Sequence, residues 1–302
     1  MGDAPNKSIE TMMLKQQGDP NSIRAMQHFI SEGAWDDQAV LARHAREVAK
    51  DLAEDDGVLI NDGSDFPKQG NDSVGVKRQY CGELGKVANC QAGVFLSYAS
   101  RKGYTLLDRR LYLPEEWFTD AGSAERREAC GVPAGVSFKT KPELALEMIT
   151  NLTEQKVLPC RWVTCDAAFS NHAFLDAMGE MVYYLAEVSA DTRVWRDRPK
   201  TGIPGYSGRG RKPSRERVLA GEAAAMMVSE IAQAVPTSNW QRQLGTKGPL
   251  EADFACVGVV SSWEGSPAIE QLLVLRRAVS SGELKYYPRS RLELLSLCSC
   301  VR

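Results

Sequence analysis

The sequence predicts an α/β protein in which a mixed sheet carries helices on its faces. Two short apolar runs that each end in an acid, GVLIND (57–62) and RWVTCD (161–166), are typical of buried strands. Two further apolar runs, 90–100 and 104–114, are separated by Arg101-Lys102-Gly103, which favours a tight hairpin turn. A helical pattern then separates this hairpin from the second acid-ended strand, so we expect sequential antiparallel strands followed by a helical crossover.

The N-terminal part, residues 8–56, has the apolar spacing of helices. The pattern is interrupted at Gly33, and a second helix is expected to begin near Asp36, whose short side chain suits an N-cap. We predict a small helical N-terminal module over residues 1–56. Such a module contacts DNA in some proteins, but amphipathic helices more commonly serve as packing units, and both interpretations stay open.

After the hairpin comes an irregular stretch rich in proline and glycine. A helix is expected over 141–155, with Pro142 in its first turn, followed by a strand at 161–166, a helix at 171–180 and a strand at 181–189. The resulting order is strand–strand–strand–helix–strand–helix–strand, which is the order of the ribonuclease-H-like fold. We therefore predict an RNase-H-like core over residues 57–190.

The character of the chain changes after residue 190. Between Arg193 and Arg217 the chain has nine basic residues and two acids, together with four glycines and three prolines, so we predict a basic loop. Such a loop suits the phosphate backbone of a nucleic acid, and the alternative is a solvated surface loop without a ligand. A helix over 215–235 and strands near 254–263, 270–278 and 283–287 complete a β-rich insertion over 191–302.

Composition excludes several classes of protein. The 302 residues include 37 Lys and Arg against 39 Asp and Glu, a net charge of -2, so the chain is no bulk polycation of the histone kind. We see no apolar run of the roughly 20 residues that span a bilayer and no signal peptide, and we expect no membrane partner. The eight cysteines lack metal-knuckle spacing and are expected to be reduced thiols of a cytoplasmic protein.

Asp62 and Asp166 are the candidate catalytic residues. They lie 104 positions apart in the chain, yet both end strands that we expect to be neighbours. A divalent cation relieves the repulsion between two close carboxylates, and hard oxygen donors suit Mg²⁺ or Mn²⁺ and in-line phosphoryl transfer. Two alternatives stay open: each Asp caps a turn or helix, or the chain is an unrelated metal-dependent phosphatase or nuclease.

Long blocks of the chain resemble the DDE transposases of the IS701 insertion-sequence family. They include DGSDFPKQGNDSVGVKRQYCGELGKVANC, RLYLPEEWF, GVSFKTKPELALEMI, VTCDAAFSNHAFLDAMG and LGTKGPLEADFA. The resemblance extends from about residue 8 to residue 287. It implies an RNase-H-like catalytic core, a divalent metal (Mg²⁺ or Mn²⁺), and cleavage and strand transfer of double-stranded DNA at insertion-sequence ends. Two paired ends would favour a homodimer, and a bacterial, nucleoid-associated protein is expected.

The resemblance also assigns individual residues. Asp62 matches the first catalytic and metal-binding Asp and Asp166 the second, while Asp65 is a weaker candidate for the first position. Basic side chains in or near the matched blocks are expected to contact DNA, with Gln79 either holding the first Asp or supporting the fold. The predicted DNA contacts are Lys68, Arg78, Arg209, Arg211, Lys212 and Lys247, the last in a GTKGP block that otherwise simply forms a turn.

One block of the family is absent. In these transposases a Glu on a helix, in a block like R-W-x-I-E, follows the strand that here ends ELKYY, whereas this chain continues PRSRLELLSLCSCVR. We therefore expect a C-terminally truncated transposase with impaired catalysis, because losing one carboxylate removes charge and geometry from a two-metal site. The alternative is an inactive DNA-binding remnant that interferes with full-length transposase.

Overall fold

The fold is described from a computed structural model, for residues 8–17, 20–206, 208, 210–244 and 251–290. The chain divides into two compact units, Met1–His44 and Ala45–Arg302. Within the larger unit we distinguish a first region (residues 45–190) and a second region (residues 191–290), each with its own hydrophobic cluster.

The N-terminal part is helical, as predicted. It contains α1 (Ile9–Gln17), α2 (Pro20–Glu32) and α3 (Asp37–Leu52). The Asp36 carboxylate accepts hydrogen bonds from the amides of Gln38 (2.9 Å) and Ala39 (3.2 Å), so Asp36 is the N-cap of α3. Helix α2 ends one residue before Gly33, where an added Cβ would meet the Phe29 carbonyl oxygen at 2.4 Å.

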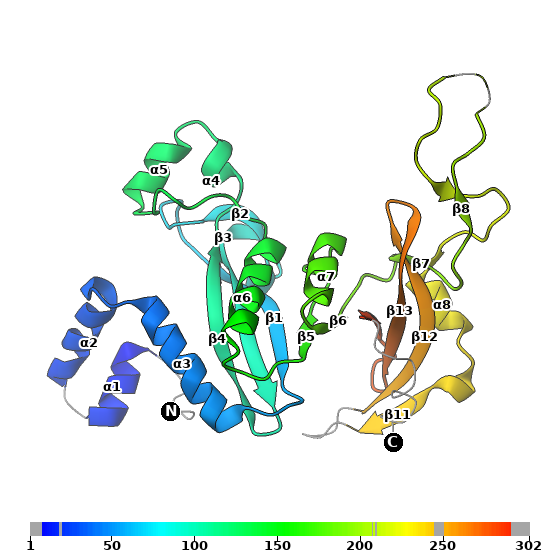
Figure 1. The fold of residues 1–302 in the computed structure, drawn as a ribbon. Coiled ribbons are helices and arrows are strands. Elements are labelled where there is room, and N and C mark those ends of the chain that lie inside the picture. The colour runs from blue at the N-terminus through cyan, green and yellow to red at the C-terminus, as the bar shows by residue number, and fades with distance from the viewer. Residues whose placement is uncertain (1–7, 18–19, 207, 209, 245–250, 291–302) are drawn as a thin grey trace. The chain divides into compact units, whose positions relative to one another are not determined.

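The first region contains a mixed sheet, the second half of α3, four further α-helices and one short 3-10 helix (Figure 1). Its strands are β1 (Val58–Pro67), β2 (Lys77–Cys81), β3 (Lys86–Ser100), β4 (Gly103–Tyr112), β5 (Trp162–Cys165) and β6 (Tyr183–Ala186), and its helical segments are η1 (Gly82–Leu84), α4 (Glu116–Thr119), α5 (Ser123–Ala129), α6 (Lys141–Gln155) and α7 (His172–Gly179). Five strands lie in the order β4-β3-β1-β5-β6, with β2 also on β3. β1 is antiparallel to β3 but parallel to β5, which is parallel to β6.

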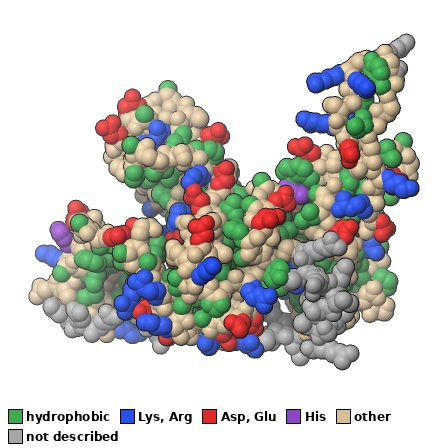
Figure 2. All heavy atoms as spheres, in the orientation of Figure 1, with side chains coloured by type: hydrophobic (Ala, Val, Ile, Leu, Met, Phe, Trp, Pro, Cys, Tyr) green, Lys and Arg blue, Asp and Glu red, His purple; other side chains and the backbone are tan. Residues whose placement is uncertain are grey.

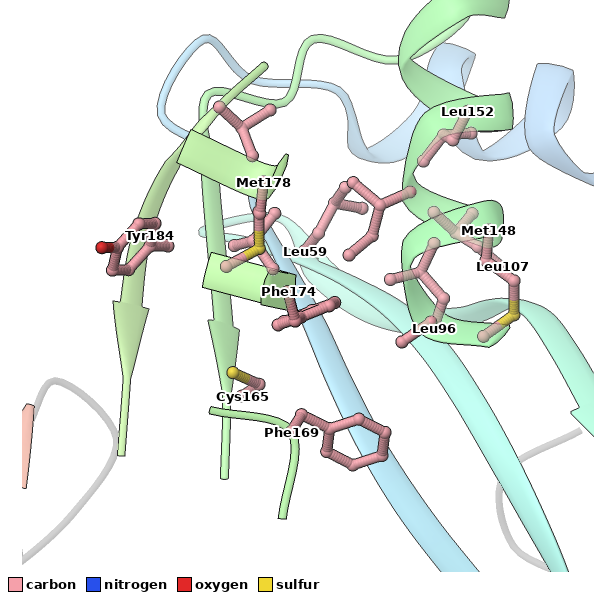
Figure 3. Close-up of a cluster of buried hydrophobic side chains, with 14 of the residues drawn as sticks. Leu59, Leu96, Leu107, Met148, Leu152, Cys165, Phe169, Phe174, Met178 and Tyr184 are labelled. Carbon is pink, nitrogen blue, oxygen red and sulfur yellow. The ribbon is translucent and has the colours of Figure 1, made fainter. Parts of the chain in front are cut away.

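Helices α6 and α7 pack on the same hydrophobic cluster (Figure 3). Leu59 and Leu96 from the sheet, Met148 from α6 and Phe174 from α7 are all buried in it. Helix α6 spans the residues predicted for it, because a capping box fixes its start: the Thr140 hydroxyl accepts from the Glu143 amide, while the Glu143 carboxylate accepts from the Thr140 amide. This packing fixes β1 and β5 relative to each other.

The second region is largely antiparallel. It consists of β7 (Arg193–Trp195), β8 (Thr201–Gly202), β9 (Arg217–Val218), β10 (Met226–Met227), α8 (Val228–Ala234), η2 (Thr237–Asn239), β11 (Gln241–Leu244), β12 (Glu251–Trp263), β13 (Ser266–Ala278) and β14 (Leu284–Arg289). The strands follow the order β10-β7-β12-β13-β14, and β14 pairs with β6, so one sheet continues through both regions. The strands predicted near 254–263, 270–278 and 283–287 are thereby confirmed.

The helix predicted over 215–235 is wrong over most of its length. Only α8, at its end, is helical. Residues Arg217–Val218 pair with Thr201–Gly202, Gly221 has a φ of +90°, and Met226–Met227 pair with β7. The alanine-rich sequence has helical propensity, but these tertiary pairings override it. The predicted basic loop over 193–217 is confirmed in part: Arg193–Trp195 form β7 and Thr201–Gly202 form β8, whereas the described residues between β8 and β9 form a loop that the β8–β9 pairing closes.

No helix among the described residues is both long and apolar enough to cross a membrane.

Candidate active site

Asp62 lies on β1, and Asp166 directly follows β5, the strand that is parallel and adjacent to β1. The β1–β5 register pairs Asn61 with Cys165, and each Asp is the next residue along the chain. Asn61 and Cys165 are buried, whereas both aspartates are exposed. Because side chains alternate along a strand, Asp62 points away from the face that packs on α6 and α7. The structure therefore places the two acids next to each other on neighbouring strands, as expected. The prediction that Asp62 ends its strand is wrong, because β1 continues to Pro67 through its pairing with β3.

The two carboxylates influence each other electrostatically. Burial raises the pKa of Asp166, and the negative charges of Asp62 and Glu187 raise it further, while a hydrogen bond from the Ala168 amide opposes the rise. The repulsion between Asp62 and Asp166 is the energetic cost that a bound cation would relieve.

The turn after β5 holds Asp166 in place. Its carboxylate accepts a hydrogen bond from the Ala168 amide at 3.0 Å, and its carbonyl accepts one from the Phe169 amide at 3.2 Å. The Phe169 ring is 1% exposed and belongs to the core cluster (Figure 3). Asp166 is thus held by a turn that is itself fixed by the buried Phe169 side chain.

Asp62 and Asp65 lie three residues apart on β1 but have different partners. Asp65 accepts a hydrogen bond from the Gly82 amide at 2.8 Å and so holds the start of η1. Asp62 accepts a hydrogen bond from the amide of its neighbour Gly63 at 2.7 Å, and this bond links Asp62 only to its own strand. This difference favours Asp62 as the metal ligand and gives Asp65 a structural role.

A third carboxylate, which the sequence reasoning missed, lies beside Asp166. Glu187 follows β6 directly, and its amide donates to the Cys165 carbonyl at 2.9 Å. Both carboxylate oxygens of this half-buried side chain lie 3.1 Å from Nζ of Lys285 on β14. The sequence contained a signal, because YYLAE repeats the pattern of an apolar strand followed by an acid.

Asp62 and Asp166 have the chemistry of a divalent cation site. Both provide hard carboxylate oxygens, they are exposed, and each destabilises the other's charge. Burial raises the pKa of the neighbouring Cys165 thiol to about 12, and its side chain belongs to the core cluster. Within the described part of the chain, no three His, Cys, Asp or Glu side chains are grouped closely enough to hold a metal, so Glu187 does not complete a triad with them.

The predicted DNA-contacting residues are distributed over several elements. Lys68 is exposed directly after β1, and Arg78 is exposed on β2. Arg211 and Lys212 are exposed on the loop between β8 and β9, where Figure 2 shows Lys and Arg side chains. Arg209 and Lys247 lie outside the described residues. The Gln79 side-chain amide donates to the Cys90 carbonyl at 3.4 Å. This contact is the one expected if Gln79 supports the fold and does not hold the first Asp.

Comparison with known proteins identifies the family. A search of curated proteins gave no match. Among solved structures the chain is similar to the NurA nuclease from Sulfolobus solfataricus, with 9% sequence identity over 90% of this chain and 82% of that chain and a TM-score of 0.34. The model of the DDE superfamily endonuclease family matches residues 1–249, which include Asp62 and Asp166. The chain therefore belongs to the DDE superfamily endonucleases.

Proposed function

We propose that this chain cleaves double-stranded DNA at the ends of an insertion sequence and transfers the strand, as a transposase of the IS701 family. Family membership supports action on DNA, and the observation that carries the proposal is the position of Asp62 on β1 next to Asp166, which directly follows the adjacent parallel strand β5. The strand order β4-β3-β1-β5-β6, with a helix on each side of β5 in the chain, supports the RNase-H-like assignment of residues 57–190.

Asp62 and Asp166 are the residues that would hold Mg²⁺ or Mn²⁺. When bound, the metal supplies Lewis-acid activation of the attacking oxygen and charge stabilisation at the leaving oxygen. The protein holds each carboxylate from its own backbone: β1 positions Asp62, and the Ala168 amide orients Asp166. The two side chains would therefore meet a cation from positions set by the backbone, which would reduce the reorganisation needed at the moment of reaction.

The basic side chains are proposed to bind the DNA backbone. Lys68 continues the strand that carries Asp62, and Arg211 and Lys212 are exposed outside the catalytic sheet. Each contact neutralises a phosphate and releases counterions. Arg78, Arg209 and Lys247 are proposed to act in the same way, and the helical module over residues 1–56 adds a second DNA contact. Pairing of two ends would bring two copies of the chain together in a nucleoid-associated complex.

A second candidate function is DNA binding without cleavage, in a product that interferes with full-length transposase. The pairing of Glu187 with Lys285 favours it. Glu187, whose charge also raises the pKa of Asp166, is already paired with this lysine, so two acids remain to hold the metal.

A nicking assay separates the two functions. The purified chain is incubated with Mn²⁺ and a supercoiled plasmid that carries the element's ends, and open-circle product is measured. We expect slow but measurable nicking by the wild type, as an impaired transposase would give, and a loss of about a hundredfold or more in Asp166→Asn, because one positioned group is worth several kcal/mol of barrier. Asp65→Asn, the same change on a structural aspartate of β1, is the control and should keep its rate within about threefold, which is less than 1 kcal/mol.

The two remaining outcomes are decisive. A gel shift with the same DNA but no nicking by the wild type would establish the binding function and reject the endonuclease. Equal nicking by the wild type and Asp166→Asn would reject Asp166 as a catalytic residue.

A further inference from the structure

The β12–β13 hairpin presents a tryptophan at its tip. Trp263 pairs with Ser266 across a two-residue turn formed by Glu264 and Gly265, whose φ values of +48° and +77° are those of a type I′ turn. This turn matches the twist of the strands and gives the tip a defined shape. Trp263 is nevertheless 47% exposed, which is a large fraction for an indole whose burial would be favourable.

The indole rests on His172. The two ring centroids are 4.3 Å apart, with 54° between their planes. His172 is the first residue of α7, and its Nδ1 lies 3.4 Å from the Asp176 carboxylate, which orients the imidazole from the other side. The hairpin tip is therefore seated on a side chain that is itself held in position.

His172 belongs to the segment that fixes Asp166. The Asp166 carboxylate accepts from the Ala168 amide, and the Asn171 side chain caps α7 by accepting from the Phe174 amide at 2.9 Å. His172 follows Asp166 by six residues and is the first residue of α7, which starts shortly after this turn. Trp263 consequently packs on the start of the helix that follows the turn holding the second catalytic aspartate.

Arginine side chains flank the hairpin. Pairing of β7 with β12 places Ser261 opposite Val194, so the next residue along each strand brings Arg193 level with Ser262. Arg198 donates to the Ala268 carbonyl at 2.7 Å and lies 3.7 Å from the Glu270 carboxylate. Arg193 also donates to the Ala225 carbonyl at 3.2 Å, and both arginines are exposed beside the hairpin. An exposed aromatic ring together with arginines on the same surface is the combination that binds unpaired nucleotides, the cations taking the phosphates and the ring taking the base.

We propose that Trp263 stacks on an unpaired nucleobase of the bound DNA, next to the position where the strand is cut. This inference rests on the proposed function, because it takes DNA as the substrate. Trp263 acts as a positioning residue: it holds a base that has left the duplex and so fixes the register of the strand relative to Asp166. Stacking does not discriminate strongly between bases, since every base has an aromatic face.

The test uses two short duplexes that differ at one nucleotide. One contains a single bulged 2-aminopurine, and the other contains the same base fully paired; binding and fluorescence are measured with Ca²⁺, which prevents turnover. We expect the wild type to quench the bulged base. Trp263→Ala should lose this quenching and bind the bulged duplex about tenfold more weakly, with less than a twofold change for the paired duplex. Trp263→Phe should keep most of the quenching.

Tyr104→Ala is the matched control. Tyr104 is 78% exposed on β4 and pairs with Ala99, which pairs with Val58 at the start of β1, so it lies at the other end of this strand from Asp62. Tyr104→Ala should leave the affinity for both duplexes and the quenching of the bulged base unchanged. Thermal unfolding of each variant verifies that the fold is retained.

The outcomes distinguish the two proposals. Absence of binding to either duplex by the wild type would overturn the proposed function and this inference with it. Binding with unchanged quenching in Trp263→Ala would overturn the inference alone. An equal loss of affinity for both duplexes would make Trp263 a clamp between the hairpin and α7, which also overturns stacking.

Discussion

The two regions of the larger unit present their chemistry in different ways. In the first region, Asp62 and Asp166 follow buried residues on short parallel strands, so their positions are set by the core. In the second region, Arg211, Lys212 and Trp263 lie in a loop and at a hairpin tip. The difference has a physical reason. Two carboxylates that repel each other must be held close together by rigid neighbours. Basic side chains and an aromatic ring that bind DNA must instead extend from the surface to reach a large substrate.

The largest expected effect concerns the two hydrophobic clusters. Leu59 (0% exposed) lies in the first cluster, and Leu275 (0% exposed) lies in the second. Leu→Ala at either position should cost about 3 kcal/mol of unfolding free energy, from lost burial and the cavity left behind. Because one sheet continues through both regions, each variant should unfold in a single transition in urea. Two separate transitions would show that the two regions unfold independently of each other, which would contradict a single cooperative unit.

The second effect concerns Asn61, which precedes Asp62 in the chain. It is 0% exposed, and neither its amide nitrogen nor its carbonyl oxygen has a hydrogen-bond partner among the described residues. Asn61→Val should therefore raise the unfolding free energy by about 1–2 kcal/mol, since an unpaired buried polar group is costly and Val suits a strand. Urea titration measures the change. A destabilised variant would show that Asn61 is satisfied and that the first region carries no such strain.

A pH effect of about 1 kcal/mol is expected at the start of α6, the helix that packs on the first cluster. The Thr140 amide donates to the Glu143 carboxylate and lowers the pKa of Glu143. Since the pKa of Glu143 is lower in the folded state, the carboxylate stabilises the protein at neutral pH. This contribution disappears as the pH falls below the unfolded pKa of about 4.3 and through the lower folded value.

Stability measured between pH 7 and pH 3 tests the cap. The difference in unfolding free energy between the wild type and Glu143→Gln should disappear as the pH is lowered to 3. Glu154→Gln, which removes a carboxylate near the other end of α6, should show no such difference. A difference that persists at pH 3 would mean that the carboxylate charge is not what stabilises this helix.

The smallest expected effect on the fold comes from the basic loop. Arg211→Gln with Lys212→Gln should leave stability unchanged but reduce the slope of log affinity for DNA against log salt by about two. The control is the double change Arg101→Gln with Lys102→Gln at the β3–β4 turn, which removes the same charge from the first region. An unchanged slope in the loop variant would show that the loop does not contact DNA, and the second region would then contribute no basic loop to binding.

Sequence patterns predicted the first region better than the second. Helix α6 was predictable because Pro142 and the capping box are local signals, and β1 and β5 because buried parallel strands are continuously apolar. Around Ala223–Ala225 local propensity was misleading, since the pairing of β9 and β10 with distant strands decides the structure there. Glu187 was missed because its relation to Asp166 depends on the pairing of β5 with β6, which spacing alone does not reveal.

Mn²⁺ binding measures whether Asp62 and Asp166 together hold one divalent cation. Free Mn²⁺ is followed by electron paramagnetic resonance during titration of the wild type and of Asp62→Asn, Asp166→Asn and Asp65→Asn. Removing either ligand should weaken binding by about tenfold or more, since the site depends on carboxylate charge. Asp65→Asn should bind as the wild type does. Equal affinity in all four proteins, or a loss confined to Asp65→Asn, would show that Asp62 and Asp166 do not hold the cation together.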